Sequence, residues 1–243
     1  MEPEALTFDI PSNLIVPVDT VDVRLDPDPH PFEMANAAAI EENWRAETDA
    51  NPALFDGTVV LLSSLVYAGG RFEGRCHAVR YATFMHWRRE RSSTAAGHVF
   101  AHAMLVSRDN ALVAIRMAAN TVNAGRVYFA AGSFEPVDFV DGAADVDFNM
   151  IREVAEETGL DISRAPRGER CYALSTDRGT VLFRRYHLTD SADEIARRIE
   201  AFVASDPEPE IAGPVIIRGA DDLPHGLMPH MKPLVEWHFS GKK

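Results

Sequence analysis

The sequence predicts an α+β fold in which strands and hairpins are interspersed with helices. Three observations favour this class. Several segments of strand length are continuously apolar or alternate apolar and polar residues. Other segments repeat apolar residues at three- and four-residue spacing, as amphipathic helices do. Gly, Pro, Asn and Asp residues separate the two kinds of segment. The chain has 243 residues, enough for one large domain or for a domain with a sizeable extension.

Residues 1–95 are predicted to form an N-terminal β/α extension. The pair Gly69-Gly70 marks the tip of a hairpin. The polar stretch 92–97 is the predicted boundary, so that a second domain covers residues 96–243. The expected strands are 14–25 (one or two strands, with a hairpin as one option), 58–67 and 75–81, and the expected helices are 33–48 and 81–91.

Residues 96–243 are predicted to contain a second hairpin, two further strands beside each other, and two helices. Ser191 and Glu194 have the spacing of a capping box at the start of one helix. An acidic, proline-rich loop is expected at 206–213. The expected strands are 98–106, 111–117, 127–131, 169–175, 181–188 and 215–218, and the expected helices are 191–204 and 227–239, the last interrupted by Pro229 and Pro233.

The most informative stretch is 132–160, GSFEPVDFVDGAADVDFNMIREVAEETGL. Its second half is predicted to be a helix that stops at Gly159. Glu153, Glu156 and Glu157 stand at i, i+3 and i+4, so they share one face and repel each other by roughly 3 kcal/mol per close pair at an effective dielectric near 20. A hard divalent cation, Mg²⁺ or Mn²⁺, would relieve this repulsion. The alternative is a solvated acidic face on a surface helix.

The spacing Arg-Glu-apolar-x-Glu-Glu-x-Gly-apolar, from Arg152 to Leu160, resembles the second half of the Nudix hydrolase box. The preceding GSFEPVD is similar to the first half, with Val137 in place of Gly and Asp138 in place of Glu. Thirteen residues rather than seven separate Asp138 from Arg152, so the loop carries about six extra residues around 139–146. A loop tolerates such an insertion.

The resemblance implies an α/β/α sandwich with a mixed sheet and a hydrolase that cleaves a diphosphate bond with Mg²⁺ or Mn²⁺ as cofactor. It implies a catalytic set of Arg152, Glu153, Glu156 and Glu157, and a metal site made by the three glutamates and Gly132. Arg152 would pair with a carboxylate; an ordinary exposed arginine is the alternative. Four further candidates are Asp138 as a ligand, Glu135 as the partner of Arg152, and Glu208 and Glu210 as the general base or as plain solubilising charges.

The substrate follows from weaker resemblances. The long box loop and the segment 43–90 are similar to the UDP-sugar diphosphatase branch of the family. A UDP-sugar is therefore the first substrate expected, as one example of a nucleoside diphosphate linked to another moiety. The alternatives are a coenzyme A or ADP-ribose diphosphatase, and an inactive Nudix-fold nucleotide sensor. Asp138 favours the sensor, whereas the intact glutamate triad favours an enzyme.

Composition limits the partners and the compartment. A net charge of −13 and a pI near 5.1 argue against binding to nucleic acid or to anionic membranes. No apolar run reaches the roughly 18 residues of a membrane span, and the N-terminus lacks signal-peptide features. Cys76 and Cys171 are expected to be reduced thiols, with the cytoplasm as the compartment. A homodimer is a further expectation from the resemblance.

The nine histidines show no complete metal-ligand pattern. His98 and His102 are four residues apart in a predicted strand and share a side. Two such histidines could bind Zn²⁺, but core or substrate-contact histidines are the preferred interpretation. His225, His230 and His238 are predicted to cover a helix surface.

Overall fold

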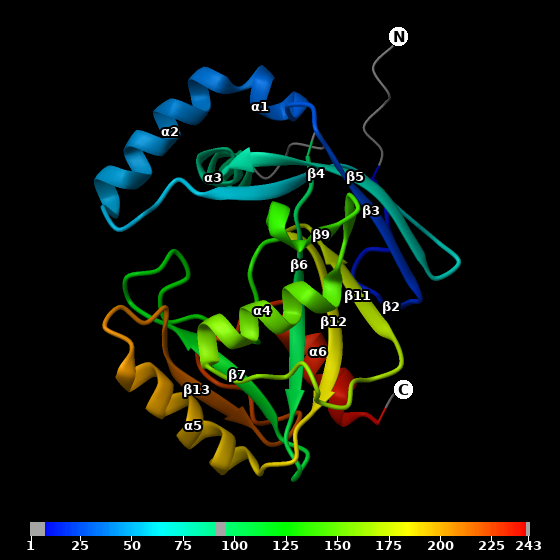
Figure 1. The fold of residues 1–243 in the computed structure, drawn as a ribbon, viewed down its shortest axis with the longest axis vertical. Helices are drawn as coiled ribbons and strands as arrows, with labels where there is room; N and C mark the ends of the chain where they lie inside the picture. Colours follow the sequence, from blue (N-terminus) through cyan, green and yellow to red (C-terminus); the bar gives the residue numbers. More distant parts are fainter. Residues whose placement is uncertain (1–7, 91–95, 242–243) are drawn as a thin grey trace. The chain divides into compact units, whose positions relative to one another are not determined.

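A computed structural model describes residues 8–90 and 96–241 (Figure 1). Within these residues the chain forms six α-helices and two mixed sheets, which confirms the mixed α+β class. The chain divides into two compact units. Unit 1 comprises Met1–Ala101, Ser133–Asn149 and Arg170–Leu182, and unit 2 comprises His102–Gly132, Met150–Glu169 and Phe183–Lys243.

The predicted division at residue 95 stays a prediction. The polar stretch 92–97, on which it depends, falls mostly on residues 91–95, which lie outside the described residues. Each compact unit is assembled from three chain segments. The borders of the units fall inside β6 (Val99–Val106), α4 (Val146–Thr158) and β12 (Gly179–His187).

Unit 1 contains a six-stranded sheet. Its two longest strands form the predicted hairpin, with Gly69 and Gly70 at the tip in left-handed conformations of φ 55° and 84°. β3 runs parallel to β5, with Thr20 opposite Arg71. In the order of the sheet, the strands are β1 (Phe8–Asp9), β4 (Thr58–Ala68), β5 (Arg71–Arg80), β3 (Thr20–Asp26), β10 (Ala143–Ala144) and β9 (Phe139–Val140).

The segment 14–25 forms two strands, but the hairpin option is wrong. β2 (Ile15–Val18) pairs with β11 (Cys171–Thr176), with Val18 opposite Cys171. β3 pairs with β5 instead. β2 ends its sheet, which accommodates Pro17 because an edge strand does not need every N–H group.

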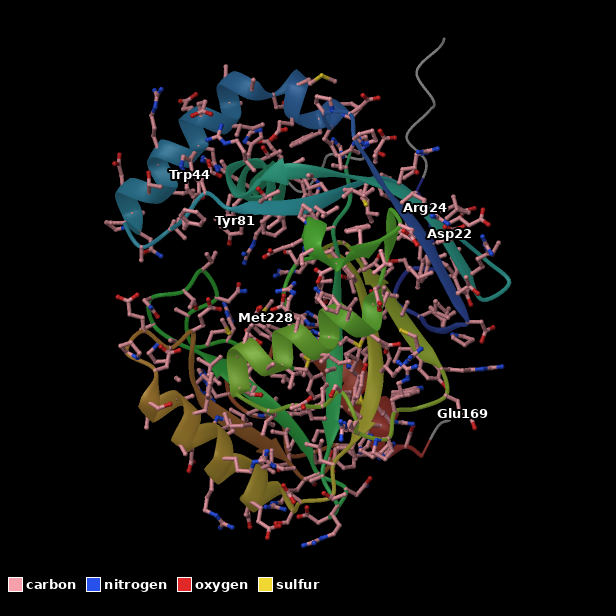
Figure 2. The ribbon with its side chains drawn as sticks, in the orientation of Figure 1. Asp22, Arg24, Trp44, Tyr81, Glu169 and Met228 are labelled. Carbon is pink, nitrogen blue, oxygen red and sulfur yellow. The ribbon has the colours of Figure 1, made fainter. Side chains whose placement is uncertain are left out.

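The helices of unit 1 are α1 (Pro31–Ala35), α2 (Ala37–Ala50) and α3 (Tyr81–Glu90). The predicted helix 33–48 is therefore two helices, divided at Asn36. The first begins earlier than predicted because the His30 ring accepts a hydrogen bond from the Phe32 N–H at 3.0 Å. α2 packs against α3, and Figure 2 shows Trp44 beside Tyr81, with ring centroids 6.3 Å apart.

The extra residues of the predicted box loop form structure of their own in unit 1. A 3₁₀ helix, η1 (Pro136–Asp138), is followed by the hairpin of β9 and β10, which turns at Asp141 and Gly142. Ala143 of β10 pairs with Arg24 of β3. Each strand of this hairpin has two residues, shorter than a sequence pattern can indicate.

Unit 2 contains strands in the order β13-β7-β6-β12, with β8 beside β7. β6 and β7 form the predicted hairpin, with Leu105 opposite Val113. β13 begins at Ile211, within the expected acidic loop, because its pairing with β7 starts opposite Met117. The remaining strands of this unit are β7 (Leu112–Met117), β8 (Val127–Tyr128) and β13 (Ile211–Ile217).

The helices of unit 2 are the main part of α4, α5 (Ala192–Ser205) and α6 (Met231–Phe239). Ser191 and Glu194 form the predicted capping box on α5. α5 lies along β13 (Figure 1), and its buried Ile195 and Ile199 contribute to the core. α6 begins four residues later than predicted, after Pro229, and buries Leu234.

None of the helices within residues 8–90 and 96–241 is both long and apolar enough to span a membrane. Cys76 and Cys171 are buried and form no disulfide in the described part of the chain. Burial, followed by the charge of Asp26, raises the pKa of the Cys76 thiol to about 12. This thiol is therefore protonated and inert at neutral pH.

Candidate functional site

The acidic helix α4 ends as the sequence predicts. Gly159 has a φ of 68°, which side-chain-bearing residues rarely adopt, and its N–H donates to the Ala155 carbonyl at 3.0 Å. A Cβ atom at Gly159 would also overlap the ring of Phe202 on α5. Glycine is therefore required here by both conformation and packing.

The three glutamates of α4 differ in exposure. Glu153 and Glu157 are each 7% exposed, whereas the side chain of Glu156 is 58% exposed. The interpretation of a plain solvated acidic face is therefore wrong for Glu153 and Glu157. Burying a carboxylate is costly unless hydrogen bonds or a cation compensate it, so the surroundings of these two groups decide what they can do.

Glu153 lies against Gly132. A Cβ atom at Gly132 would overlap both carboxylate oxygens of Glu153. The absence of a side chain at Gly132 thus creates the space that the Glu153 carboxylate occupies. The two residues are 21 positions apart, so this contact links the helix to the loop with which the box spacing pairs it.

Glu157 contacts Ala131, the residue that precedes Gly132 in the same loop. Its Oε2 accepts a hydrogen bond from the Ala131 N–H at 2.9 Å. Burial raises the pKa of Glu157 well above its ordinary value, and the charges of Glu153, Glu210 and Glu156 raise it further, while the Ala131 N–H opposes the shift. Glu157 is therefore a carboxylate with less positive compensation than its burial requires.

Arg152 pairs with two of the glutamates. Its guanidinium nitrogens lie 2.8 Å from Glu153 Oε1 and 2.9 Å from Glu156 Oε2. The side chain is 15% exposed, so the interpretation as an ordinary exposed arginine is wrong. The proposed partner Glu135 belongs to unit 1, and its pairing with Arg152 stays a prediction.

Asp138 is fully buried in unit 1 and holds the box loop in shape. Its Oδ2 accepts hydrogen bonds from the Glu135 N–H and from Asn149 Nδ2, both at 2.9 Å. Glu135 and Asp138 together form a capping box on η1. These contacts explain why an acidic residue stands at position 138. The role of Asp138 as a metal ligand stays a prediction.

Glu208 and Glu210 are both exposed in unit 2. The Glu208 N–H donates to Asp206 Oδ1 at 3.0 Å, in a local turn. The Glu210 carbonyl accepts from the Ala118 N–H at 2.9 Å, and the Glu210 charge acts on Glu157. Of the two candidates, Glu210 is therefore the one whose charge acts on the buried glutamate. A general-base role stays a prediction for both.

The donor set can be tested against the cation that the resemblance implies. Among residues 8–90 and 96–241, no three His, Cys, Asp or Glu side chains are arranged around a common point as metal ligands would be. The donors nevertheless fit a hard cation by chemistry, because two buried carboxylates, Glu153 and Glu157, lie against consecutive residues of a loop backbone. Burial and the neighbouring carboxylates raise the pKa of Glu157, and a bound cation would oppose that shift.

Three histidines are predicted to cover a helix surface, and none of them does. His225 is exposed but lies in a turn before α6, His230 has its Nε2 3.0 Å from Nε2 of His102, and His238 lies on α6 but is buried. Those predictions are wrong. His230 and His102 are 128 positions apart, so no spacing in the sequence could have indicated the pair. In unit 1, burial and the charge of Arg88 lower the pKa of His98 to about 3, as befits a core histidine.

Comparison with known proteins gives a distant structural likeness. No family model matches the chain, and no curated protein matches it. A MutT protein from Methanosarcina mazei Go1 is 14% identical, covers 58% of this chain and 91% of its own, and has a TM-score of 0.39. A MutT NUDIX hydrolase from Burkholderia pseudomallei is 18% identical and has a TM-score of 0.35. That match covers 57% of this chain and 95% of the Burkholderia chain. A NUDIX hydrolase from Nitrosomonas europaea is 16% identical and has a TM-score of 0.31. That match covers 50% of this chain and 72% of the Nitrosomonas chain. The chain thus has a partial, distant structural resemblance to Nudix hydrolases.

Proposed function

We propose that this protein is a divalent-metal-dependent hydrolase of the Nudix type, which cleaves a diphosphate bond in a nucleoside diphosphate linked to another moiety. One observation carries the proposal. Two buried glutamates one helical turn apart, Glu153 and Glu157, contact the consecutive loop residues Gly132 and Ala131. The box spacing pairs this helix with this loop, and the contacts support that pairing.

Glu153, Glu156, Glu157 and the carbonyl of Gly132 would hold Mg²⁺ or Mn²⁺. Such a cation neutralises phosphate charge and lowers the pKa of a water bound to it. Arg152 fixes Glu153 and Glu156 through its two ion pairs, and the Ala131 N–H fixes Glu157. These contacts restrict the carboxylates before substrate arrives, which lowers the cost of ordering them.

A UDP-sugar is the first substrate we propose. The proposal rests on the lengthened box loop, which forms the β9–β10 hairpin, and on the segment 43–90. Coenzyme A and ADP-ribose are the alternative substrates. The other functional class is a nucleotide sensor without catalysis, which one observation favours: the carboxylate of Asp138 is engaged by Glu135 and Asn149.

The test is turnover of UDP-glucose, ADP-ribose, coenzyme A and dinucleotides, with Mg²⁺, with Mn²⁺ and with EDTA. We expect metal-dependent release of a phosphate monoester from at least one of them. Glu157→Gln should lower this turnover at least about 100-fold, since metal-ion catalysis supplies several kcal/mol and each 1.4 kcal/mol is tenfold. Glu200→Gln, which removes an exposed glutamate on α5, is the matched control.

The outcomes separate the alternatives. Turnover that persists in EDTA, or in Glu157→Gln, contradicts the metal assignment. Turnover restricted to UDP-sugars supports the UDP-sugar diphosphatase branch. Turnover of another diphosphate supports the proposed reaction but contradicts that branch. Metal binding without turnover of any compound supports the sensor.

A further inference from the structure

Two buried histidines lie beside each other in unit 1. His30 immediately precedes α1 and is 0% exposed, and His77 on β5 is 6% exposed. Their ring centroids are 4.9 Å apart, and the ring planes differ by 68°. All four ring nitrogens have hydrogen-bond partners, and the chemistry of each partner fixes which nitrogen carries a proton.

The partners of His30 require a proton on Nε2. Its Nδ1 lies 3.0 Å from the Phe32 N–H, which can only donate, so Nδ1 accepts and carries no proton. Its Nε2 lies 3.1 Å from the Leu62 carbonyl, which can only accept. His30 is therefore the neutral tautomer with its proton on Nε2.

The partners of His77 require the other tautomer. Its Nδ1 lies 2.8 Å from the Asp28 carbonyl, so Nδ1 carries the proton. Its Nε2 lies 3.0 Å from the Ser63 hydroxyl oxygen, and in a neutral ring this nitrogen accepts from the hydroxyl. The two neighbouring rings are thus held in opposite tautomers.

A second proton would have a different consequence on each ring. On His77 it would go to Nε2, where the Ser63 oxygen can accept from it while the hydroxyl donates to the Arg75 carbonyl, 3.4 Å away. On His30 it would go to Nδ1, where two N–H groups would then face each other. His30 therefore cannot be protonated in place without losing its hydrogen bond with Phe32.

That hydrogen bond is the N-cap of α1. The helix has only five residues, so it contains few hydrogen bonds of its own. Pro31 at its first position has no N–H group. The Met34 N–H donates to the His30 carbonyl at 3.1 Å. The side chain and the backbone of His30 thus both hold the start of α1.

The groups around His30 oppose a positive charge on its ring. Burial is the largest cause that lowers the pKa of His30, and the charge of His77 lowers it further, while the Leu62 carbonyl and the charge of Glu33 raise it. The Glu33 carboxylate is itself engaged by the Thr83 hydroxyl. The titratable groups on the surrounding elements are Glu33 on α1, His77 and Cys76 on β5, His86 on α3, and Asp28 in the loop before α1.

We propose that His30 is a pH-sensitive cap, which holds α1 in place at neutral pH and lets α1 open as the solution is acidified. In the open form the His30 ring takes up a proton from water, and the Phe32 N–H bonds to water instead of to Nδ1. The open form binds one proton more than the capped form, so acid favours opening. The opening is local, because α2 has its own first hydrogen bond, from the Ile40 N–H to the Asn36 carbonyl at 2.9 Å.

The first test determines the tautomers of the wild-type protein from the nitrogen chemical shifts of its histidine rings, at about pH 7.5, where an ordinary histidine is neutral. We expect the proton on Nε2 in His30 and on Nδ1 in His77. A proton on Nδ1 of His30 overturns the proposal. This test needs no variant, so its result does not depend on how well a variant folds.

The second test is amide hydrogen exchange at about pH 7.5 and about pH 5.5, corrected for the intrinsic effect of pH on exchange. We expect the protection factor of the Phe32 amide to fall about five- to tenfold, because a histidine in the open form is mostly protonated at the lower pH. The Ile40 amide of α2 should change by less than about twofold. An equal fall at both amides indicates general acid unfolding and overturns the local opening.

His30→Asn separates the cap from the proton. Asparagine is a strong N-cap that does not titrate, and the Leu62 carbonyl keeps its second donor, the Gly97 N–H at 2.9 Å. The protection of the Phe32 amide in this variant should therefore be the same at both pH values. His30→Ala, which removes the cap altogether, should give low protection at both.

His225→Ala is the matched control, because it removes an exposed histidine from unit 2. It should keep the wild-type fall in protection of the Phe32 amide. If His30→Asn shows the same fall as this control, the proton acts at another group and the assignment to His30 is overturned.

Discussion

Asp138 and Glu157 are both buried carboxylates in the same 29-residue stretch, 132–160, yet their surroundings are opposite. Asp138 accepts two hydrogen bonds, from the Glu135 N–H and from Asn149. Glu157 accepts one, from Ala131, and is acted on by three other carboxylates. Burial alone therefore does not distinguish the two carboxylates. The balance of donors and charges around each of them does.

This difference has an energetic meaning. A carboxylate with good donors stabilises the fold through charge-assisted hydrogen bonds. A carboxylate with too few donors destabilises it until a proton or a cation arrives. We interpret Asp138 as a group that holds the loop and Glu157 as a group that binds the cation.

The largest expected effect is at Asp138. Asp138→Ala should lower the free energy of unfolding by about 3 kcal/mol, because two donors lose a charged acceptor and a cavity remains. Chemical denaturation monitored by circular dichroism measures it. Asp49→Ala, at an exposed position of α2, should stay within about 0.5 kcal/mol of the wild type. If Asp138→Ala is as stable as that control but loses Mn²⁺ binding, Asp138 and Glu157 have similar roles. That result would contradict the difference proposed between them.

An intermediate effect is expected at Gly132. Gly132→Ala should push the Glu153 carboxylate from its place, because the added Cβ overlaps both oxygens. The free energy of unfolding should fall by about 1 kcal/mol, since the displaced group is the end of a flexible side chain. Mn²⁺ affinity should fall about tenfold or more by calorimetry. Unchanged Mn²⁺ affinity would show that Glu153 is no ligand.

The smallest effect is a pH dependence at Glu157. A carboxyl whose folded pKa is raised keeps its proton when the unfolded chain has lost it, so stability declines as pH rises through that interval. In EDTA, the wild-type free energy of unfolding should therefore decline from about pH 4.5 upward, and Glu157→Gln should remove part of the decline. Glu200→Gln should keep it. An equal decline in both variants would contradict the raised pKa.

Local signals in the sequence predicted local structure. The stop of α4 at Gly159, the capping box of Ser191 and Glu194, and the hairpin tip at Gly69 are all correct, because each depends on neighbours within a few residues. The closeness of Glu153 to Gly132 was implied only by the family resemblance.

Features that depend on distant partners could not be predicted. β2 pairs with β11, not with β3, because of packing that no turn signal encodes. The β9–β10 hairpin is too short for a periodic pattern and is held by β3. The pair of His102 and His230 joins positions whose separation in the chain carries no motif.

The pairing of β2 with β11 also limits when the protein can fold during synthesis. Val18 meets Cys171, a residue that leaves the ribosome about 150 residues later. The partner strand of β2 is therefore absent until most of the chain has been made, and contacts of such long range slow folding. A fragment that ends before residue 171 would expose the edge of β2 and should aggregate more readily than the full-length chain.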